Sequence, residues 1–209
     1  MNGWLRAASL LALALLTTSC ALTALTNSAG KEATQFHTLS PEAVKPARAR
    51  ASSSSIILLV SSPRAYPGYD AARMVYLIKP YTLGYFAHNQ WVDTPQRMLG
   101  PLVARAMEAT GRFFAVVQTP TSLPGAYRLD TDIVQLQQEF LQRPSQYRIV
   151  LSAMLADLRS GQLLGSRSFE AVEPAPSDDP YGGVVAANRA LARLLSDMAG
   201  WVVSLLGSR

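Results

Sequence analysis

Cys20 is the only cysteine in the 209-residue sequence, and its thiol is the most reactive side chain that the sequence offers. A single cysteine can be a small buried hydrophobic residue or, in an exported protein, a group that reacts with another molecule. With no second cysteine in the sequence, no intrachain disulfide can form. The neighbouring residues decide between the two roles, because Cys20 directly follows an apolar run and the small residues 17–19.

Other candidates for chemistry are few. His37 and His88 are the only histidines, so a zinc site lacks ligands. The sequence contains no G-x-S-x-G motif, no P-loop and no G-x-G-x-x-G motif. Asp130 and Asp132 alternate with apolar residues, as acidic side chains on the solvated face of a strand do. We therefore expect no catalytic site and no metal site, and we interpret the protein as a binder.

Three further acidic residues have structural explanations. Asp178 and Asp179 directly precede a predicted helix, and they suit helix capping better than metal binding. Asp157 lies close to Arg159 and a glycine, which indicates a turn rather than a catalytic pair.

Residues 1–19 have the pattern of an export signal, with a positive charge at Arg6, an apolar run over residues 7–16 and small residues after it. The run is about half of the ~20 residues that a membrane-spanning helix needs. Together with Cys20, the segment resembles the lipobox of bacterial lipoproteins, although Thr17 stands where that motif usually has leucine. The resemblance implies that residues 1–19 are removed, that the Cys20 sulfur carries diacylglycerol, and that the new amino group is acylated.

The resemblance also implies a location. Two or three acyl chains on one residue hold a protein at a bilayer much more firmly than a single chain does. In such lipoproteins an aspartate after the cysteine commonly marks retention in the inner membrane, and here the next residue is Ala21. We expect a lipid anchor on Cys20 in the outer membrane of a Gram-negative bacterium, with the body facing the periplasm. No cofactor is expected apart from this covalent lipid.

The rest of the chain has the composition of a folded domain. Hydrophobic residues make up 49% and charged residues 16%, which excludes a disordered chain. No second stretch approaches the length of a membrane span. The net charge of +5 suits phosphate-rich lipid surfaces or peptidoglycan, and we do not expect nucleic-acid binding. We expect residues 20–33 to form a lipidated tether and residues 34–209 a single α+β domain, with a flexible segment over residues 40–55.

Hydrophobic periodicity predicts the elements of this domain. Strands are predicted over residues 34–39, 56–60, 113–117, 127–133, 147–158 and 163–172, and a hairpin pairs residues 74–78 with residues 84–87. The alternation changes phase at residues 134–136, which predicts a β-bulge or a changed environment. One helix is predicted to start after Thr94 and to kink or restart at Pro101, and a second is predicted to start at Pro180. This order predicts a mainly antiparallel sheet with two helices packed on one face.

Aromatic residues gather between positions 66 and 91. The set is Tyr66, Tyr69, Tyr76, Tyr81, Tyr85, Phe86 and Trp91. Core packing is one interpretation. The other is an exposed aromatic and basic surface for a partner or a lipid, since amphipathic rings are favoured at interfaces.

Two segments in this window, PGYDAARMVYL at residues 67–77 and WVDTP at residues 91–95, resemble the ABC-type transport auxiliary lipoproteins. That family includes the paraquat-inducible protein C type of intermembrane transport lipoprotein. Its members commonly show a lipobox, a first strand of the Tyr-Tyr-x-Leu kind, a Tyr/Arg segment and a Trp-x-acid-Pro start of a helix. Here Phe36 and His37 replace both tyrosines of the first strand, and one extra residue separates Asp93 from Pro95.

The resemblance implies a non-enzymatic component of an intermembrane lipid transport system. Its expected partners are an ABC permease, its ATPase and a periplasmic MCE-domain protein, which the body would dock at the outer membrane. The residues that match the family motifs, Tyr69, Arg73, Tyr76 and Trp91, are the expected partner-binding residues. Two alternatives are a lipoprotein that supports cell-wall or outer-membrane assembly and an anchored hydrolase. Whether the chain forms a homo-oligomer is left open by the sequence.

Overall fold

The structure of the protein is a computed structural model that describes residues 33–40 and 55–207. The expected signal, Cys20, most of the expected tether and most of the segment 40–55 lie outside the described residues. The chain divides into two compact units, residues 1–34 and 35–209, and every described helix and strand belongs to the second.

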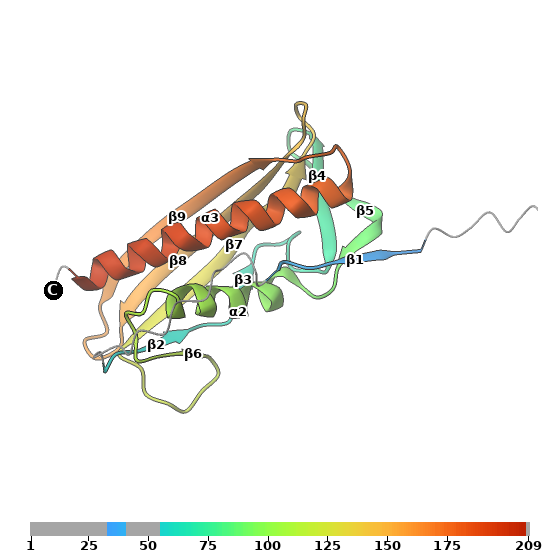
Figure 1. The fold of residues 1–209 in the computed structure, drawn as a ribbon. Helices are drawn as coiled ribbons and strands as arrows, with labels where there is room; N and C mark the ends of the chain where they lie inside the picture. Colours follow the sequence, from blue (N-terminus) through green and yellow to red (C-terminus); the bar gives the residue numbers. More distant parts are fainter. Residues whose placement is uncertain (1–32, 41–54, 208–209) are drawn as a thin grey trace, which may run out of the picture. The chain divides into compact units, whose positions relative to one another are not determined.

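The second unit is an α+β fold, shown in Figure 1. Its strands and helices are β1 (Gln35–His37), β2 (Ile57–Val60), β3 (Arg64–Ala65), β4 (Arg73–Lys79), β5 (Thr82–Trp91), α2 (Pro95–Glu108), β6 (Ala115–Gln118), β7 (Tyr127–Glu139), β8 (Gln146–Asp157), β9 (Leu163–Pro174) and α3 (Pro180–Gly207).

The strand β7 organises the sheet. One of its edges pairs in turn with β2, β3 and β4, all parallel to it. Its other edge pairs antiparallel with β8, which pairs antiparallel with β9. Beyond β4 the sheet continues through the antiparallel hairpin partner β5 to β1, and β6 lies parallel to β2. Most paired residues belong to the antiparallel ladders, so the predicted fold class is confirmed. The short parallel pairings were not predicted.

The predicted β-bulge is confirmed in β7. The register against β8 shifts between Ile133 and Gln135. Because cross-strand partners share a face of a sheet, the shift places Gln137 and Glu139 on the same face as Arg148 and Gln146 of β8. This polar face lies opposite the face that the helices cover.

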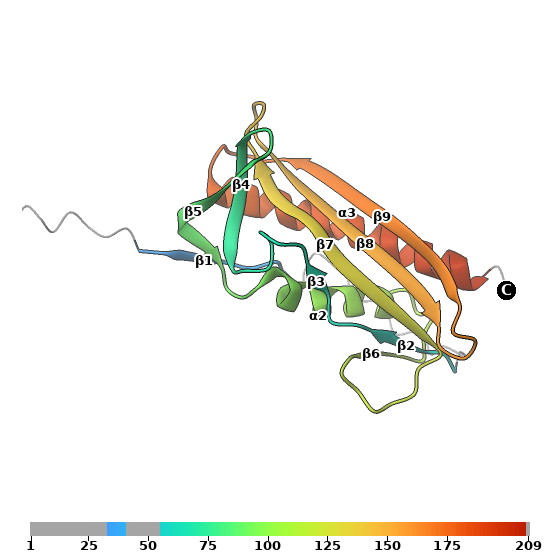
Figure 2. The ribbon, with the colours of Figure 1, turned by 180° about the vertical axis from the view of Figure 1, so that it is seen from behind.

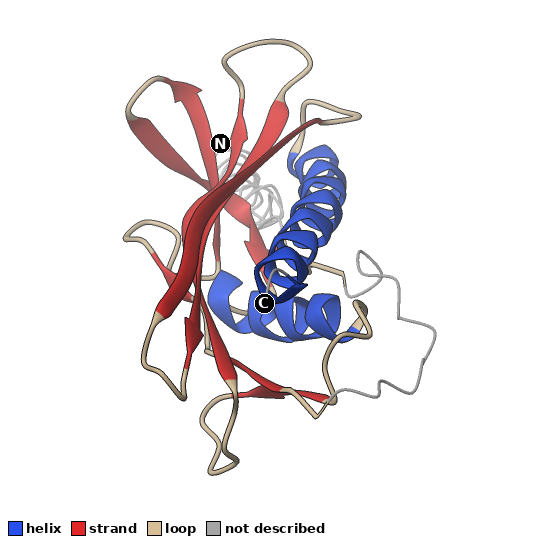
Figure 3. Cartoon of the chain, turned by 90° about the vertical axis from the view of Figure 1, so that its left-hand side faces the viewer, coloured by secondary structure: helices blue, strands red, loops and turns tan. Residues whose placement is uncertain are grey.

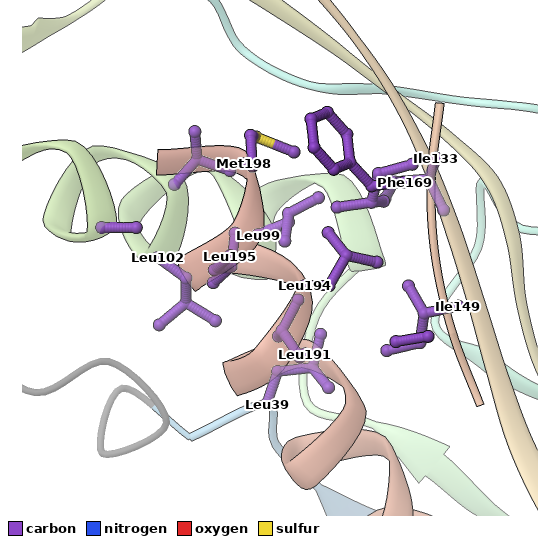
Figure 4. Close-up of a cluster of buried hydrophobic side chains, with 14 of the residues drawn as sticks. Leu39, Leu99, Leu102, Ile133, Ile149, Phe169, Leu191, Leu194, Leu195 and Met198 are labelled. Carbon is purple, nitrogen blue, oxygen red and sulfur yellow. The ribbon is translucent and has the colours of Figure 1, made fainter. Parts of the chain in front are cut away.

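Both helices cover one face of the sheet, as predicted and as Figure 3 shows. The helix α3 packs on β8 and β9, while α2 contacts α3 and the β6 side of the sheet. Figure 4 shows the core between these layers. Its labelled side chains are Leu39, Leu99, Leu102, Ile133, Ile149, Phe169, Leu191, Leu194, Leu195 and Met198.

The helix α3 is capped as predicted. The backbone N–H of Gly182 donates to Oδ1 of Asp179 over 2.7 Å, and this bond is the first cause of a lowered pKa of Asp179. Asp178 instead accepts a bond of 2.6 Å from the backbone N–H of Ser145, which joins the start of α3 to the turn between β7 and β8. Asp157 makes the predicted turn, since it accepts bonds from the backbone N–H groups of Arg159 and Ser160.

The helix α2 starts with Pro95 after Thr94, as predicted, but it runs through Pro101 without restarting. A proline inside a helix removes one backbone hydrogen bond. Leu99, Leu102 and Val103 on either side of it are buried in the core. Their burial outweighs the lost bond, so the predicted restart is wrong, and the alternative of a kink at Pro101 stays a prediction.

In the described part of the chain, α3 alone is long and apolar enough to cross a membrane by length and composition, with 28 residues and a mean hydropathy of 1.3 in its most apolar window. This length corrects the expectation that no stretch after residue 19 approaches a membrane span. Its apolar stripe, which includes Leu191, Leu194 and Leu195, is buried against the sheet. The apolar stripe of α3 is therefore buried inside the domain, as in a core helix.

Residues 35–40 are held to the domain from two sides. The ring Nε2 of His37 lies 2.8 Å from Oδ1 of Asn89 on β5. Asn188 of α3 accepts a bond from the backbone N–H of Ser40 and donates one to the carbonyl of Thr38. The start of the described domain is therefore fixed both to the sheet edge and to α3.

Candidate functional site

The four residues expected to bind a partner do not form one surface. Trp91 is 1% exposed and Tyr69 is 7% exposed, and both belong to the core. Tyr76 is half-buried against Phe86, with 4.7 Å between the ring centroids. Arg73 is exposed. For Trp91 and Tyr69 the structure therefore supports core packing, and a role in partner binding stays a prediction for Arg73 and Tyr76.

Arg73 is held in place by stacking. Its guanidinium carbon lies 3.8 Å from the centroid of the Tyr85 ring, on the next strand of the hairpin. A guanidinium on an aromatic face keeps its N–H donors free to bind a carboxylate. Arg73 and Tyr85 thus form a preorganised contact for an acidic group.

The burial of Tyr69 follows from the loop before β4. The backbone N–H of Tyr66 donates to the carbonyl of Ile133, and that of Tyr69 donates back to the carbonyl of Tyr66. Gly68 between them has φ 95°, which side chains rarely adopt. The turn brings the hydroxyl of Tyr69 to Gln137, where it donates to Oε1.

This hydrogen bond is part of a buried polar network on the face of the sheet away from the helices. The amide of Gln137 donates to Oε1 of Glu139 over 2.8 Å, and that of Gln146 donates to Oε2 over 3.0 Å. Arg148 donates from Nε to Oε1 of Glu139 over 2.8 Å and also pairs with Glu170. The network therefore connects β7, β8 and β9 with the loop that carries Tyr69.

The network sets the charge state of Glu139. Burial alone raises the pKa of this carboxyl group, but the hydrogen bonds from Arg148, Gln146 and Gln137 outweigh burial, and the resulting pKa is lowered. Burial, followed by the nearby charge of Glu139, raises the pKa of Tyr69. At neutral pH the network holds an ionised carboxylate and a neutral phenol.

Two turns lie side by side at one end of the sheet, as Figures 1 and 2 both show. We call them the hairpin end: residues 78–83, around the turn between β4 and β5, and residues 140–145, which join β7 to β8. The backbone N–H of Phe140 donates to the carbonyl of Leu77 over 2.8 Å, which fixes one turn beside the other. Four large apolar side chains of these turns are exposed: Tyr81 is fully exposed, Ile78 is 61% exposed, Leu141 is 49% exposed and Leu83 is 40% exposed.

A pocket of about 550 Å³ lies below the hairpin end. Its lining includes the apolar side chains Leu77, Leu83 and Leu141 together with Glu139 and Arg148 of the polar network. This site was not predicted from the sequence. The signal in the sequence was the set of polar residues Gln135, Gln137 and Glu139. They share one face of β7, opposite the core face, only when the predicted bulge is taken into account.

The remaining acidic candidates serve as ion-pair partners. Asp132 receives two hydrogen bonds from Arg64, at 2.6 and 3.0 Å. Asp130 lies 3.0 Å from Nε of Arg128. Within residues 33–40 and 55–207, no group of three His, Cys, Asp or Glu side chains could hold a metal ion. Asp130 and Asp132 therefore belong to the charged outer face of the sheet, as expected.

Residues 37–199 match the sequence model for the ABC-type transport auxiliary lipoprotein component. The chain belongs to this family. The resemblance drawn from residues 67–77 and 91–95 is thereby confirmed. Membership of the ABC-type transport auxiliary lipoprotein family associates the protein with an ABC transport system, as a lipoprotein component rather than as the transporter itself.

Solved structures share the fold of the family domain. Protein XCC0632 from Xanthomonas campestris, described as a DUF330 protein, is 24% identical, with a TM-score of 0.71 over 83% of this chain and 96% of that chain. An uncharacterised protein is 14% identical, with a TM-score of 0.64 over 82% of this chain and 99% of that chain. No curated protein matches this chain.

Proposed function

We propose that this protein is an outer-membrane-anchored lipoprotein that docks the periplasmic component of an ABC/MCE-type intermembrane lipid transport system. The observation that carries the proposal is the family match over residues 37–199, which spans nearly all of the described domain. The proposed anchor is the lipid on Cys20.

In this proposal the transporter's ATPase supplies the energy and the lipoprotein supplies a fixed point at the membrane. A lipid that passes through water exposes its acyl chains, at a cost of about 0.8 kcal/mol for each methylene group. A protein that holds the periplasmic component against the membrane shortens or removes that exposed path. Docking alone therefore accelerates lipid transfer without any chemical step.

The exposed Arg73, held over the partly buried ring of Tyr85, supports a docking role. Arginine and tyrosine are enriched among the residues that dominate protein interfaces. The guanidinium is already oriented by the ring 3.8 Å away, so binding a partner carboxylate costs little additional side-chain entropy. We assign to this pair the contact with an acidic group of the periplasmic MCE-domain protein.

The test is capture of partners from detergent-solubilised membranes with the tagged full-length lipoprotein. Wild type is expected to recover the permease, the ATPase and the MCE-domain protein. Arg73→Glu is expected to recover at least several-fold less, because it places two like charges at the contact. Arg167→Glu is the matched control, since Arg167 also lies over an aromatic ring, 5.0 Å from the centroid of Phe169 on β9.

Two outcomes would count against the proposal. One is wild-type protein that recovers none of these components while lipid transfer continues after deletion of its gene. The other is recovery of cell-wall or outer-membrane assembly proteins in their place, which would favour the alternative function. Cys20→Ser is expected to release the protein from membranes under either function, so it tests the anchor alone.

A further inference from the structure

Tyr81 has an unusual backbone conformation for a tyrosine. It follows Pro80 in the two-residue turn between β4 and β5, and its φ is 63°. That position of the turn normally carries glycine or asparagine, because a side chain there is strained. Tyr81 is the only residue other than glycine with a positive φ among residues 33–40 and 55–207. Its ring is fully exposed, so packing inside the domain gives no compensation for this strain.

The second observation is the set of side chains around Tyr81. Leu83 and Leu141 line the same pocket as Tyr81 and are 40% and 49% exposed, and Ile78, two residues before Pro80 in the sequence, is 61% exposed. Exposed aliphatic and aromatic side chains that gather in one place usually mark a binding surface. The hairpin end therefore presents four exposed large apolar side chains.

The third observation is charge. Lys79 and Arg143 are the only charged residues in the two turns, and both are basic and exposed. The nearest acidic partner is Asp178, whose carboxylate lies 4.0 Å from Nε of Arg143. Glu139, which precedes the second turn, is buried and paired with Arg148. The exposed tip thus combines apolar side chains with positive charge.

We propose that the hairpin end inserts its apolar side chains into the interfacial layer of a bilayer that contains anionic phospholipid. Tyrosine is favoured at the headgroup level of a membrane, aliphatic side chains below it, and lysine or arginine at the phosphates. A protein interface is the competing occupant, but lysine is depleted from such interfaces, and here the exposed Lys79 lies between Ile78 and Tyr81 in the sequence. This contact is additional to the proposed docking through Arg73 and to the proposed lipid on Cys20.

The experiment uses the unlipidated mature chain, residues 20–209 with Cys20→Ser, so that no acyl chain contributes to binding. Co-sedimentation is measured with vesicles of phosphatidylethanolamine, alone or mixed with phosphatidylglycerol. The chain is expected to bind the mixed vesicles better. Introducing Tyr81→Gly and Ile78→Ser together into this chain is expected to lower its apparent affinity for the mixed vesicles about tenfold. The reason is that binding scales with the apolar area that enters the membrane. Lys79→Glu with Arg143→Glu is expected to remove the preference for the anionic lipid.

Two controls separate binding from folding. Tyr81→Gly alone suits a φ of 63°, so any loss of binding in this variant does not come from unfolding. Phe114→Ser removes another exposed aromatic ring, located just before β6 and outside the hairpin end, and is expected to leave vesicle binding unchanged.

The inference is overturned if the Cys20→Ser chain binds neither vesicle, or if Tyr81→Gly with Ile78→Ser binds as well as the parent chain. It is also overturned if those substitutions abolish capture of a protein partner without affecting vesicle binding, because the hairpin end would then be a protein-docking surface. Failure of vesicle binding with intact recovery of the ABC components contradicts this inference and leaves the proposed function in place.

Discussion

Arg148 and Glu139 lie on neighbouring strands, and Nε of Arg148 donates to Oε1 of Glu139 over 2.8 Å. Gln137 and Gln146 donate to the same buried carboxylate. Removing one partner of a buried charged group leaves the other without compensation, which costs more than the net strength of the bond. The pair therefore stabilises the polar face of the sheet only while Glu139 is ionised.

Glu139→Gln is expected to lower the free energy of unfolding at pH 7 by about 1–3 kcal/mol. The cause is the loss of the charged acceptor beside Arg148. Urea unfolding followed by circular dichroism measures the change. Glu108→Gln, at an exposed position of α2, is the control and is expected to stay within about 0.5 kcal/mol of wild type.

The difference in stability between wild type and Glu139→Gln is expected to depend on pH. Because the pKa of Glu139 is lowered in the folded state, its contribution is fully present above the unfolded-state value of about 4.3. The contribution is lost as the pH falls through the folded-state pKa. The difference in stability between wild type and Glu139→Gln is therefore expected to shrink below about pH 4. An equal difference at pH 7 and pH 3 would show that the charge of Glu139 has no such role.

Two glycines of α3 are expected to respond in opposite directions to alanine. A Cβ at Gly183 would overlap the side-chain amide of Gln138, which is held in place by its bonds to Ser145 and to the carbonyl of Asp179. Gly183→Ala is expected to destabilise the protein by about 1–3 kcal/mol. A Cβ at Gly200 meets no atom within 4 Å, and Gly200→Ala is expected to stabilise it by about 0.5–1 kcal/mol. Thermal unfolding distinguishes the two, and a shift of both variants in one direction would contradict the close packing of α3 on β7.

Asp179→Ala is expected to lower the free energy of unfolding by about 1 kcal/mol, because the backbone N–H of Gly182 loses its side-chain acceptor. Asp179→Ser keeps a capping oxygen and is expected to recover most of the loss. Asp197→Ala, on the exposed side of the same helix, serves as the control. If chemical denaturation gave the same stability for all three variants, the cap would have no energetic role.

Tyr81→Gly is expected to raise the free energy of unfolding by about 1 kcal/mol, because glycine adopts a φ of 63° without strain. Thr82→Gly, at the first residue of β5, is the matched control and is expected to lower it by about 0.5–1 kcal/mol. Differential scanning calorimetry on both variants measures the effect. A loss of stability in Tyr81→Gly would mean that the tyrosine ring contributes to the fold.

The elements with strong periodicity could be predicted from the sequence. The alternation of residues 127–133, its change of phase and the cap of α3 all have local causes, so each left a local pattern. The parallel pairings of β2, β3 and β4 with β7 depend on residues 50 or more positions apart, and no local pattern records them.

The candidate site was harder to predict for a different reason. An aromatic residue has the same character in a core and on a surface, so Trp91 and Tyr81 could not be told apart, although one is buried and the other fully exposed. Gln137 and Glu139 lie beyond the strand predicted over residues 127–133, and the distant loop that carries Tyr69 contacts Gln137 there. The family resemblance indicated the functional class, and the structure showed which residues lie on exposed surfaces.

The central position of β7 has a consequence for how the chain matures. Three strands that come before it in the sequence need its edge, and β8 and β9 come after it. Before residues 127–139 have emerged, β4 can pair with β5 and β2 with β6, but in the described sheet these two pairs are joined only through β7. Contacts between such distant segments also form slowly. Synthesis and any translocation thus proceed with these early strand pairs still separate, and the sheet is completed late.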